Sequence, residues 1–434
     1  FFLFAHFFHQ HVLSILFVLS WLVHPNVILA QFDFLFFNKT LRFDYLHIGD
    51  ARNEFFALDE LLEEPYWAGS HLHLIDTFGY GKFQCRLYDQ ATGELIYSRG
   101  YSTLFSEWQT TLEAQNVYRA FEESVVMPFP RHDAFIEIYS RNRKGQFEKK
   151  FSYPFRVNDY FVNQKQRMVF PVFKIREVAP AEKALDIVIL PEGYTSQQME
   201  IFKQDCQKFA EILLGYSPYN EYSDKINIKA VLAPSFEESS DFPPSGIWKN
   251  TLLHSKFYTF DLDRYCMTDA FQTVRDVASN APYDQIYILV NSSMYGGGAI
   301  FNYYALSVNS NMLAGKVFIH EFGHSFAGLA DEYYDSEVAY NEFYPLDLEP
   351  QEPNITTLVN FKRKWADMIE EGTPIPTPAE EIYRNKVGVF EGGGYAAKGI
   401  YRPAMDCLMN TFRQNTFCPV CIRAIRKMLD FYTQ

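Results

Sequence analysis

The chain has few basic residues, few cysteines and, beyond residue 30, no apolar stretch long enough to cross a bilayer. The 39 Lys and Arg residues against 53 Asp and Glu residues give a formal net charge of −14. Such a chain repels phosphate backbones, which argues against nucleic acid as a partner. The 6 cysteines are spread too thinly to form a disulfide framework for the whole fold.

The first 30 residues contain no Asp, Glu, Lys or Arg. An apolar run over residues 12–19 is followed by Pro25 and then by a small residue, Ala30. This order is typical of a secretory signal peptide, although the segment has neither an initiator Met nor a positive start. The alternative is a membrane anchor, which Pro25 interrupts before it reaches a secure spanning length. We predict that residues 1–30 are a signal peptide with a clipped or misassigned start. The protein is then exported to the periplasm, cell surface or medium, and it meets a membrane only through an uncleaved leader.

The N-terminal part, residues 31–168, has the pattern of an antiparallel β-sandwich. The length of 434 residues exceeds what one compact core usually holds, so we expect two domains. Short runs that alternate apolar and polar residues, such as residues 135–139, are separated by turns such as residues 143–145. Alternation with a period of two, broken by a turn about every ten residues, predicts antiparallel strands. Residues 169–182 contain two prolines and are expected to be a linker.

Residues 180–434 follow a different pattern, in which strands alternate with helices. This alternation predicts an α/β domain, and the whole chain is therefore of the α+β multidomain class. Three glycines at residues 296–298 are expected to form a turn. The expected strands are at residues 186–190, 226–232, 285–290 and 305–308, and the expected helices at residues 196–214 and 269–279.

The motif with the most chemical content lies at residues 313–329, LAGKVFIHEFGHSFAGL. It is apolar nearly all round, which predicts a buried helix, where polar side chains are costly unless paired or coordinated. The i, i+4 spacing places His320 and His324 on one face, where both rings can bind a single Zn²⁺. Glu321 lies beside that face, so it is placed to accept a proton from a water molecule at the metal. The motif therefore predicts a zinc-dependent hydrolase with Glu321 as its general base.

A catalytic zinc site needs a third protein ligand and one open position. A continuous helix cannot supply it, because seven residues further on lies about 10 Å along the axis. Gly328 is the natural end of the helix, and Asp331 and Glu332 follow just beyond it. One of these two acidic residues is the expected third ligand, and the other is then a partner that supports the ligands.

Two features resemble the metzincin class of zinc peptidases. Metzincins place a ligand three residues after a glycine that follows the second histidine, which favours Asp331 here over Glu332. In this chain the glycine comes one residue later than usual and no third histidine follows. Residues 407–410, CLMN, resemble the metzincin Met-turn, which implies that Met409 lies beneath the metal.

Three cysteines, Cys407, Cys418 and Cys421, cluster near the C-terminus. The CPVC segment at residues 418–421 fits half of a zinc ribbon, a redox pair or a disulfide partner for Cys407. A fourth nearby cysteine is lacking, so a structural zinc is the least favoured of these. In an exported protein we expect a disulfide among the three, which would tie the Met-turn to the C-terminal helix.

Together these segments resemble the IgA-specific metalloendopeptidase family of secreted bacterial zinc peptidases. The resemblance implies a zincin-like metallopeptidase domain at residues 180–434 and a protein or peptide substrate. The family name does not by itself establish immunoglobulin as that substrate. The segments that carry the resemblance are ILPEGY at 189–194, GIWKNT at 246–251, HEFGHSFAGLADEY at 320–333, YRP at 401–403, and the CLMN to CPVC stretch.

The same resemblance implies how a substrate would bind. The strand at residues 305–308 would be the edge strand, with Ala305 and Ser307 pairing with an extended peptide. Residues 334–391 are expected to form a flap or subdomain over the cleft, or only a long insertion.

Two other hypotheses remain open from the sequence. The aromatic-rich β-domain, in a chain with 18% aromatic residues, suits a non-catalytic secreted surface-binding protein with a structural zinc site. Glu321 counts against this hypothesis, because a structural site needs no base. A zinc hydrolase that acts on a non-protein bond is the least favoured.

Overall fold

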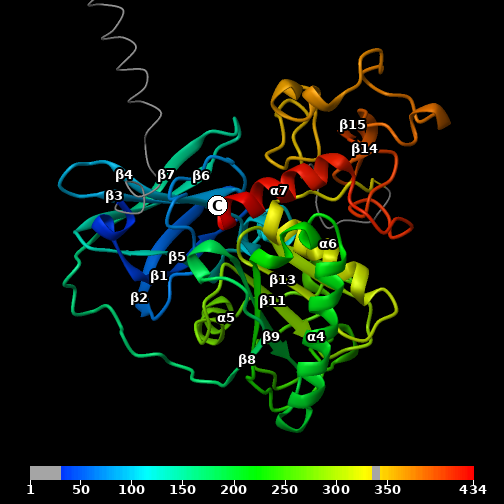
Figure 1. Cartoon of the computed structure of the whole chain (residues 1–434). Helices are drawn as coiled ribbons and strands as arrows, with labels where there is room; N and C mark the ends of the chain where they lie inside the picture. Colours follow the sequence, from blue (N-terminus) through cyan, green and yellow to red (C-terminus); the bar gives the residue numbers. More distant parts are fainter. Residues whose placement is uncertain (1–30, 335–342) are drawn as a thin grey trace, which may run out of the picture.

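The computed structural model describes residues 31–334 and 343–434. The predicted leader at residues 1–30 lies outside the described residues. A β-rich N-terminal part lies beside an α/β part, as the sequence predicts (Figure 1). Within the described ranges, no helix has the length and apolar content needed to cross a membrane.

Two antiparallel sheets form the N-terminal part, with strand orders β2-β1-β5 and β4-β3-β6-β7. Alternate residues of both sheets point into one shared core, which includes Phe43, Phe83 and Ile136. The predicted antiparallel β-rich domain is therefore confirmed. Its strands are β1 (Phe36–Gly49), β2 (Glu54–Glu64), β3 (Phe83–Asp89), β4 (Leu95–Tyr101), β5 (Arg119–Pro130), β6 (Ala134–Arg141) and β7 (Phe147–Phe155), and helix α3 (Leu104–Trp108) follows β4.

The second part is built on a six-stranded sheet of order β12-β13-β11-β9-β10-β8. The four inner strands are parallel, and the two outer strands, β12 and β8, pair antiparallel with their neighbours. The inner strands are buried along their whole length, because helices cover both faces of the sheet. The strands are β8 (Val172–Arg176), β9 (Leu185–Glu192), β10 (Ile226–Val231), β11 (Gln285–Val290), β12 (Gly297–Ile300) and β13 (Tyr304–Val308).

Helices α4 (Met199–Gly215) and α6 (Ala314–Ala327) lie together on one side of this sheet, and α5 (Phe271–Ala278) lies on the other (Figure 1). Phe318 of α6 stacks on Tyr287 of β11 with ring centroids 3.9 Å apart, so α6 is held tightly against the sheet. The remaining elements are α7 (Pro419–Thr433), the hairpin β14 (Phe390–Gly393) and β15 (Ala396–Arg402), and the 3-10 turns η1 (Glu113–Gln115), η2 (Ala181–Lys183), η3 (Ser196–Gln198), η4 (Tyr219–Lys225), η5 (Pro243–Ser245), η6 (Thr259–Asp261), η7 (Phe361–Arg363), η8 (Ala366–Met368) and η9 (Glu381–Tyr383).

The segment expected to be a linker contains a strand of the second sheet. β8 lies within residues 169–182 and pairs with β10. This pairing joins residues about fifty positions apart, so local sequence pattern did not reveal it. The two parts of the chain also meet through buried ions, because Arg42 of β1 lies 2.8 Å from Asp276 of α5.

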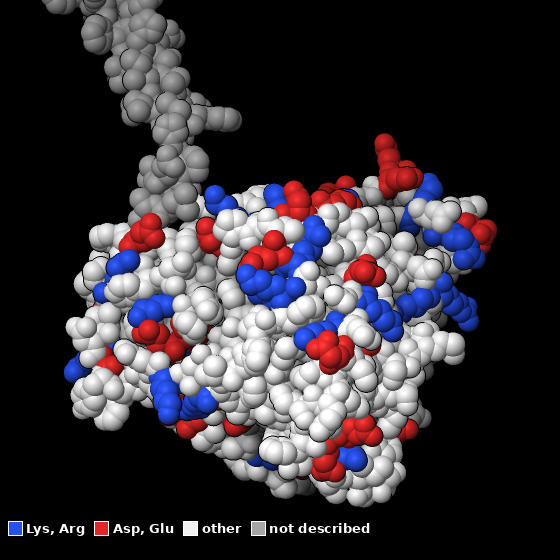
Figure 2. All heavy atoms as spheres, turned by 60° about the horizontal axis from the view of Figure 1, so that its bottom comes forward, with Lys and Arg blue, Asp and Glu red and all other residues white. Residues whose placement is uncertain are grey.

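Acidic and basic side chains are interspersed on the face of the molecule shown in Figure 2. Although the chain carries a net charge of −14, Lys and Arg lie among the Asp and Glu residues there. This face therefore presents no broad field of one sign that would attract a partner by charge alone.

Candidate active site

Helix α6 carries the histidine motif and ends where the sequence predicts. It runs from Ala314 to Ala327, and Gly328 terminates it in the left-handed conformation with φ 62°. Ile319 and Phe322 on its inner side are fully buried in the core. Their packing fixes the rotation of the helix about its axis, so the motif residues on the opposite side face a cavity.

The two imidazoles are held by backbone carbonyls. Nδ1 of His320 donates to the carbonyl oxygen of Leu408 at 3.1 Å, and Nδ1 of His324 donates to that of Leu329 at 2.5 Å. A carbonyl oxygen only accepts hydrogen bonds, so each Nδ1 carries the proton. Each Nε2 is then free to bind a metal ion with its lone pair, as in zinc sites whose histidines are oriented by a carbonyl.

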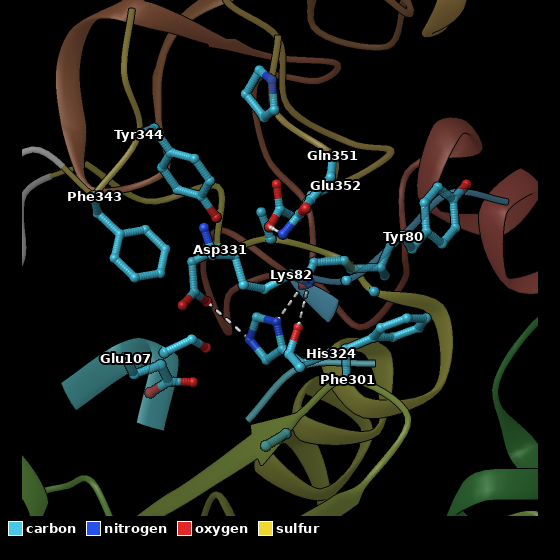
Figure 3. A pocket seen from close by; sticks show the side chains of 18 of the residues that line it. Tyr80, Lys82, Glu107, Phe301, His324, Asp331, Phe343, Tyr344, Gln351 and Glu352 are labelled. Atoms are coloured by element: carbon cyan, nitrogen blue, oxygen red, sulfur yellow. Dashed lines mark hydrogen bonds and ion pairs between the residues drawn. The ribbon is translucent and has the colours of Figure 1, made fainter. Parts of the chain in front are cut away.

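The chain turns back after Gly328 and brings Asp331 to the two rings. Oδ1 of Asp331 lies 3.0 Å from Nε2 of His320 and 3.3 Å from Nε2 of His324. Figure 3 shows His324 and Asp331 facing each other across this short gap. Glu332 does not join them, because its carboxylate accepts hydrogen bonds from Asn354 and Cys421 instead. The structure thus brings together His320, His324 and Asp331.

These three side chains fit a divalent metal ion. The two Nε2 atoms are 3.0 Å apart, and two lone pairs at that distance repel each other unless a metal ion or a proton lies between them. Oδ1 of Asp331 is buried, and among the described residues only the two imidazole Nε2 atoms lie within hydrogen-bonding distance of it. Ligand atoms around a tetrahedral zinc ion with bonds of roughly 2.0–2.1 Å are about 3.3 Å apart, close to the separations here.

The charges of the cluster are strongly coupled. Burial would lower the pKa of His324, but the adjacent Asp331 outweighs this effect and raises that pKa to about 9. Burial would raise the pKa of Asp331, but the two histidines hold it well below its usual range. A proton and a metal ion therefore compete for the same nitrogen, and binding of the ion releases the proton.

Glu321 lies between the histidines and strand β12. A Cβ atom placed on Gly297 would lie 3.0 Å from Oε1 of Glu321 and 2.9 Å from Cγ1 of Val317, so only glycine leaves this carboxylate its space. Burial raises the pKa of Glu321, and the two histidines oppose the shift. A raised pKa suits a group that takes up and returns a proton near neutral pH.

The prediction of the edge strand was wrong. Strand β13, which carries Ala305 and Ser307, is an inner strand between β11 and β12, and both residues are fully buried. The hydroxyl of Ser307 accepts a hydrogen bond from Tyr287 at 2.9 Å and is not available to a substrate. Two of the three glycines expected to form a turn, Gly297 and Gly298, instead begin β12, which covers the outer edge of β13.

Only part of the outer edge of β12 is free to pair. The N–H of Gly297 donates to the carbonyl of Arg264 at 3.1 Å, and its carbonyl accepts from Cys266 at 3.2 Å. Backbone groups of an antiparallel strand face outward at every second residue, so the next outward pair belongs to Ala299. Ala299 is half-buried and lines the cavity in front of Glu321.

The cavity in front of the motif has a volume of about 1370 Å³ and is shared by both parts of the chain. The N-terminal domain contributes Tyr80 and Lys82, and residues 343–345 and 348–353 also line the cavity. Figure 3 shows Tyr344 and Tyr80 on either side of His324. The described part of the segment expected to be a flap therefore forms a wall of the site. Nothing in the sequence indicated that the N-terminal domain also lines this cavity.

Comparison with known families decides the class of the protein. The profile of the family described as IgA Peptidase M64 matches residues 173–385 and 379–429, more than half of the chain. The chain belongs to the IgA Peptidase M64 family. A second profile, described as Peptidase M64 N-terminus, matches residues 31–152. The predicted resemblance is confirmed, whereas no curated protein matches the chain.

As a member of the M64 family, the protein is a metallopeptidase, a hydrolase that acts on peptide bonds. The family implies a metal ion, and the described residues offer a group of His320, His324 and Asp331 that could hold it. The substrate is accordingly a protein or a peptide. Family membership also argues against the hypothesis of a non-catalytic binding protein.

The residues of the predicted Met-turn lie directly under helix α6. Met409 is fully buried, and a Cβ atom on Gly323, between the two histidines, would lie 3.2 Å from its sulfur. The carbonyl of Cys407 accepts hydrogen bonds from the N–H groups of Asn410 and Thr411, both at 2.9 Å, which closes the turn.

The expected disulfide is not present in the structure. Cys407, Cys418 and Cys421 are all free and buried. The sulfur atoms of Cys407 and Cys421 are 3.9 Å apart, whereas a disulfide bond is roughly 2.0 Å long.

Two residues that sequence analysis did not assign hold the loop that carries Asp331. Tyr395 donates a hydrogen bond to Oδ2 of Asp331 at 2.6 Å. The side chain of Asn354 is fully buried. Its amide oxygen accepts a hydrogen bond from the N–H of Ala330 at 2.7 Å, and its amide nitrogen donates one to the carbonyl of Ala330 at 2.9 Å. Tyr395 lies close to the family segment at residues 401–403, but nothing in its sequence context distinguishes it from the other tyrosines among the 29. Asn354 likewise lies in no motif that would have indicated its role.

Proposed function

We propose that this M64 peptidase is a secreted, zinc-dependent endopeptidase in which Glu321 is the general base. The observation that carries the proposal is the convergence of His320, His324 and Asp331, with ligand atoms 3.0 to 3.3 Å apart, beside Glu321. Two imidazoles and one carboxylate are the ligand set of many catalytic zinc sites. Glu321 is not one of these ligands, so its carboxylate is available for proton transfer.

The residues of this chain divide the chemistry among them. A zinc ion held by the two histidines and Asp331 would polarise the scissile carbonyl and acidify water. Glu321 accepts a proton from the attacking water and delivers it to the leaving amine. Leu408, Leu329 and Tyr395 keep the three ligands in position through the hydrogen bonds described above.

The shape of the cavity favours cleavage within a chain. A volume of about 1370 Å³, lined by both parts of the chain, accommodates several residues of an extended peptide. The outward-facing backbone groups of Ala299 can pair with such a peptide and hold it next to Glu321. Backbone pairing recognises any extended peptide, so we propose cleavage of proteins in general rather than cleavage at one specific sequence.

Digestion of casein and of immunoglobulin A, for which the family is named, tests the proposal. Each protein is incubated with the full chain, with and without a chelator, and the products are identified by mass spectrometry. We expect internal cleavage that stops after chelation and returns when zinc is added. Release of terminal residues only would contradict an endopeptidase, and activity that survives complete metal removal would contradict the zinc site.

Export rests on the leader at residues 1–30 and is a separate proposal. Phe32 is fully buried in the core of the β-domain, so the described fold begins within two residues of the expected cleavage point after Ala30. N-terminal sequencing of protein recovered outside the cytoplasm is expected to begin at Gln31. Recovery of the intact leader on cytoplasmic protein would contradict export.

A further inference from the structure

A second group of ligand-type side chains lies behind the active site and has no part in the mechanism. Glu332, Cys407, Cys418 and Cys421 are all buried, and one ligand atom from each lies within 4.8 Å of the others. The four residues come from the loop after α6, from the Met-turn and from the first turn of α7. They are distinct from the histidine site, although Glu332 follows Asp331 directly.

Two distances in this cluster are close to those expected around a tetrahedral zinc ion. With Zn–S bonds of about 2.3 Å, two sulfur ligands are about 3.8 Å apart. The sulfur atoms of Cys407 and Cys421 are 3.9 Å apart. The sulfur of Cys421 lies 3.2 Å from Oε1 of Glu332, close to the shorter separation expected between a sulfur and an oxygen ligand. The pair of cysteines at residues 418–421 has the C-x-x-C spacing of structural zinc sites.

The buried carboxylate of Glu332 points to a cation. The side chain is fully buried, and both of its neutral donors, Asn354 and Cys421, bind Oε1. Oε2 has no hydrogen-bond partner among the described residues. A buried carboxylate whose negative charge is not balanced by hydrogen bonds or by a cation destabilises the folded protein. A disulfide between two of the cysteines would leave this carboxylate, and the third thiol, unexplained.

The surrounding backbone suits sulfur ligands that carry negative charge. The N–H of Cys418 donates to the sulfur of Cys407 at 3.2 Å. Cys418 is the N-cap of helix α7, so the positive end of the helix dipole lies at the cluster. Both contacts stabilise thiolates, which are the form of cysteine that binds a metal.

We propose that Glu332, Cys407, Cys418 and Cys421 bind a second, structural zinc ion. On binding, the three thiols give up their protons to solvent and all four positions of the ion are filled by protein. The ion would join three segments that surround the first site. Cys407 adjoins Leu408, whose carbonyl orients His320, and the N–H of Glu332 donates to the carbonyl of Met409 at 2.8 Å.

Metal analysis of the full chain, purified with a mild reductant, tests this proposal. We expect about two zinc ions per chain in the wild type and about one in the His320→Ala/His324→Ala variant. After replacement of zinc by cobalt, both proteins are expected to show the near-ultraviolet absorption of thiolate-to-cobalt charge transfer. The Cys418→Ser/Cys421→Ser variant is expected to lose that band and about one zinc ion, while the control Cys206→Ser, at a buried position of helix α4, keeps both.

The proposal is overturned if the wild type binds about one ion and its cobalt form lacks the thiolate band. A disulfide among the three cysteines that persists under these conditions would overturn it as well. If the cysteine variant fails to fold, the wild type and the histidine variant decide the matter by the cobalt band alone. The test does not depend on peptidase activity, so it stands even if the proposed function fails.

Discussion

Asp331 and Glu332 are neighbours in the chain, yet their side chains belong to two different clusters. Asp331 lies with two imidazoles at the wall of a cavity of about 1370 Å³, whereas Glu332 lies with three thiols in the interior. A site open to a cavity leaves a coordination position for water and substrate, whereas a closed, sulfur-rich site does not. The difference in ligands and access therefore separates a catalytic role from a structural one.

The two clusters also share their supports. The carbonyl of Met409 accepts the N–H of Glu332, and the carbonyl of Leu408 orients His320. The Met-turn thus contacts both sites through its backbone. The clusters have no ligand in common, so a change in one is expected to affect the other only weakly, through the geometry of this turn.

The largest effect is expected from Asp331→Ala compared with Glu332→Gln. Loss of a direct ligand should weaken zinc binding at the histidine site by more than about 100-fold, since even an outer partner is worth about 10- to 100-fold. Glu332→Gln should leave this site largely occupied and disturb the thiolate cluster instead. Competition with a chelator, followed by cobalt spectra, distinguishes the two. An equal loss of zinc affinity at the histidine site in both variants would contradict the distinction between the two clusters.

A smaller effect is expected from Tyr395→Phe. Its hydroxyl holds Oδ2 of Asp331 at 2.6 Å, so its removal should weaken metal binding at the histidine site by about 10- to 100-fold. Tyr401→Phe is the matched control, because Tyr401 contributes a backbone pairing with Thr356 at this end of the domain. Chelator competition measures both. An unchanged affinity in Tyr395→Phe would show that Asp331 needs no such support.

The helix and its histidines could be predicted because their geometry is local. The i, i+4 spacing within an apolar run determines which side chains share a face, and Gly328 ends the helix in the conformation that glycine favours. The same reasoning placed Asp331 and Glu332 just after the turn. It could not decide which of them meets the histidines, because that depends on where Asn354 and Tyr395 hold the loop.

Features that depend on distant pairing were missed. The glycines of β12 have a low strand propensity, so they indicated a turn, and only the pairing with β13 makes them an edge strand. β8 lies in a segment with prolines and is a strand only because it pairs with β10. The thiol cluster lacks a fourth cysteine, and its fourth member, Glu332, lies 75 positions before Cys407 in the chain, beyond any spacing rule.

The smallest effect is expected from Gly297→Ala, which tests the catalytic cluster without touching a ligand. The new methyl group would lie 3.0 Å from Oε1 of Glu321, so the carboxylate must shift by a few tenths of an ångström. We expect kcat/KM to fall about tenfold with the zinc content unchanged. Gly215→Ala at the end of α4 is the control, because a Cβ atom there meets nothing within 4 Å. Equal activity of the two variants would contradict the close contact between β12 and Glu321.

The most direct test of the central claim measures zinc content and peptide cleavage on the same preparation of Glu321→Gln. The account predicts that this variant retains the zinc content of the wild type and loses proteolysis by at least about 100-fold, because the metal ligands remain and the base is gone. Glu211→Gln, on the exposed side of α4, serves as the control and should cleave at the wild-type rate. Cleavage by Glu321→Gln at the wild-type rate, or loss of its zinc, would contradict the assignment of Glu321 as the general base beside the metal.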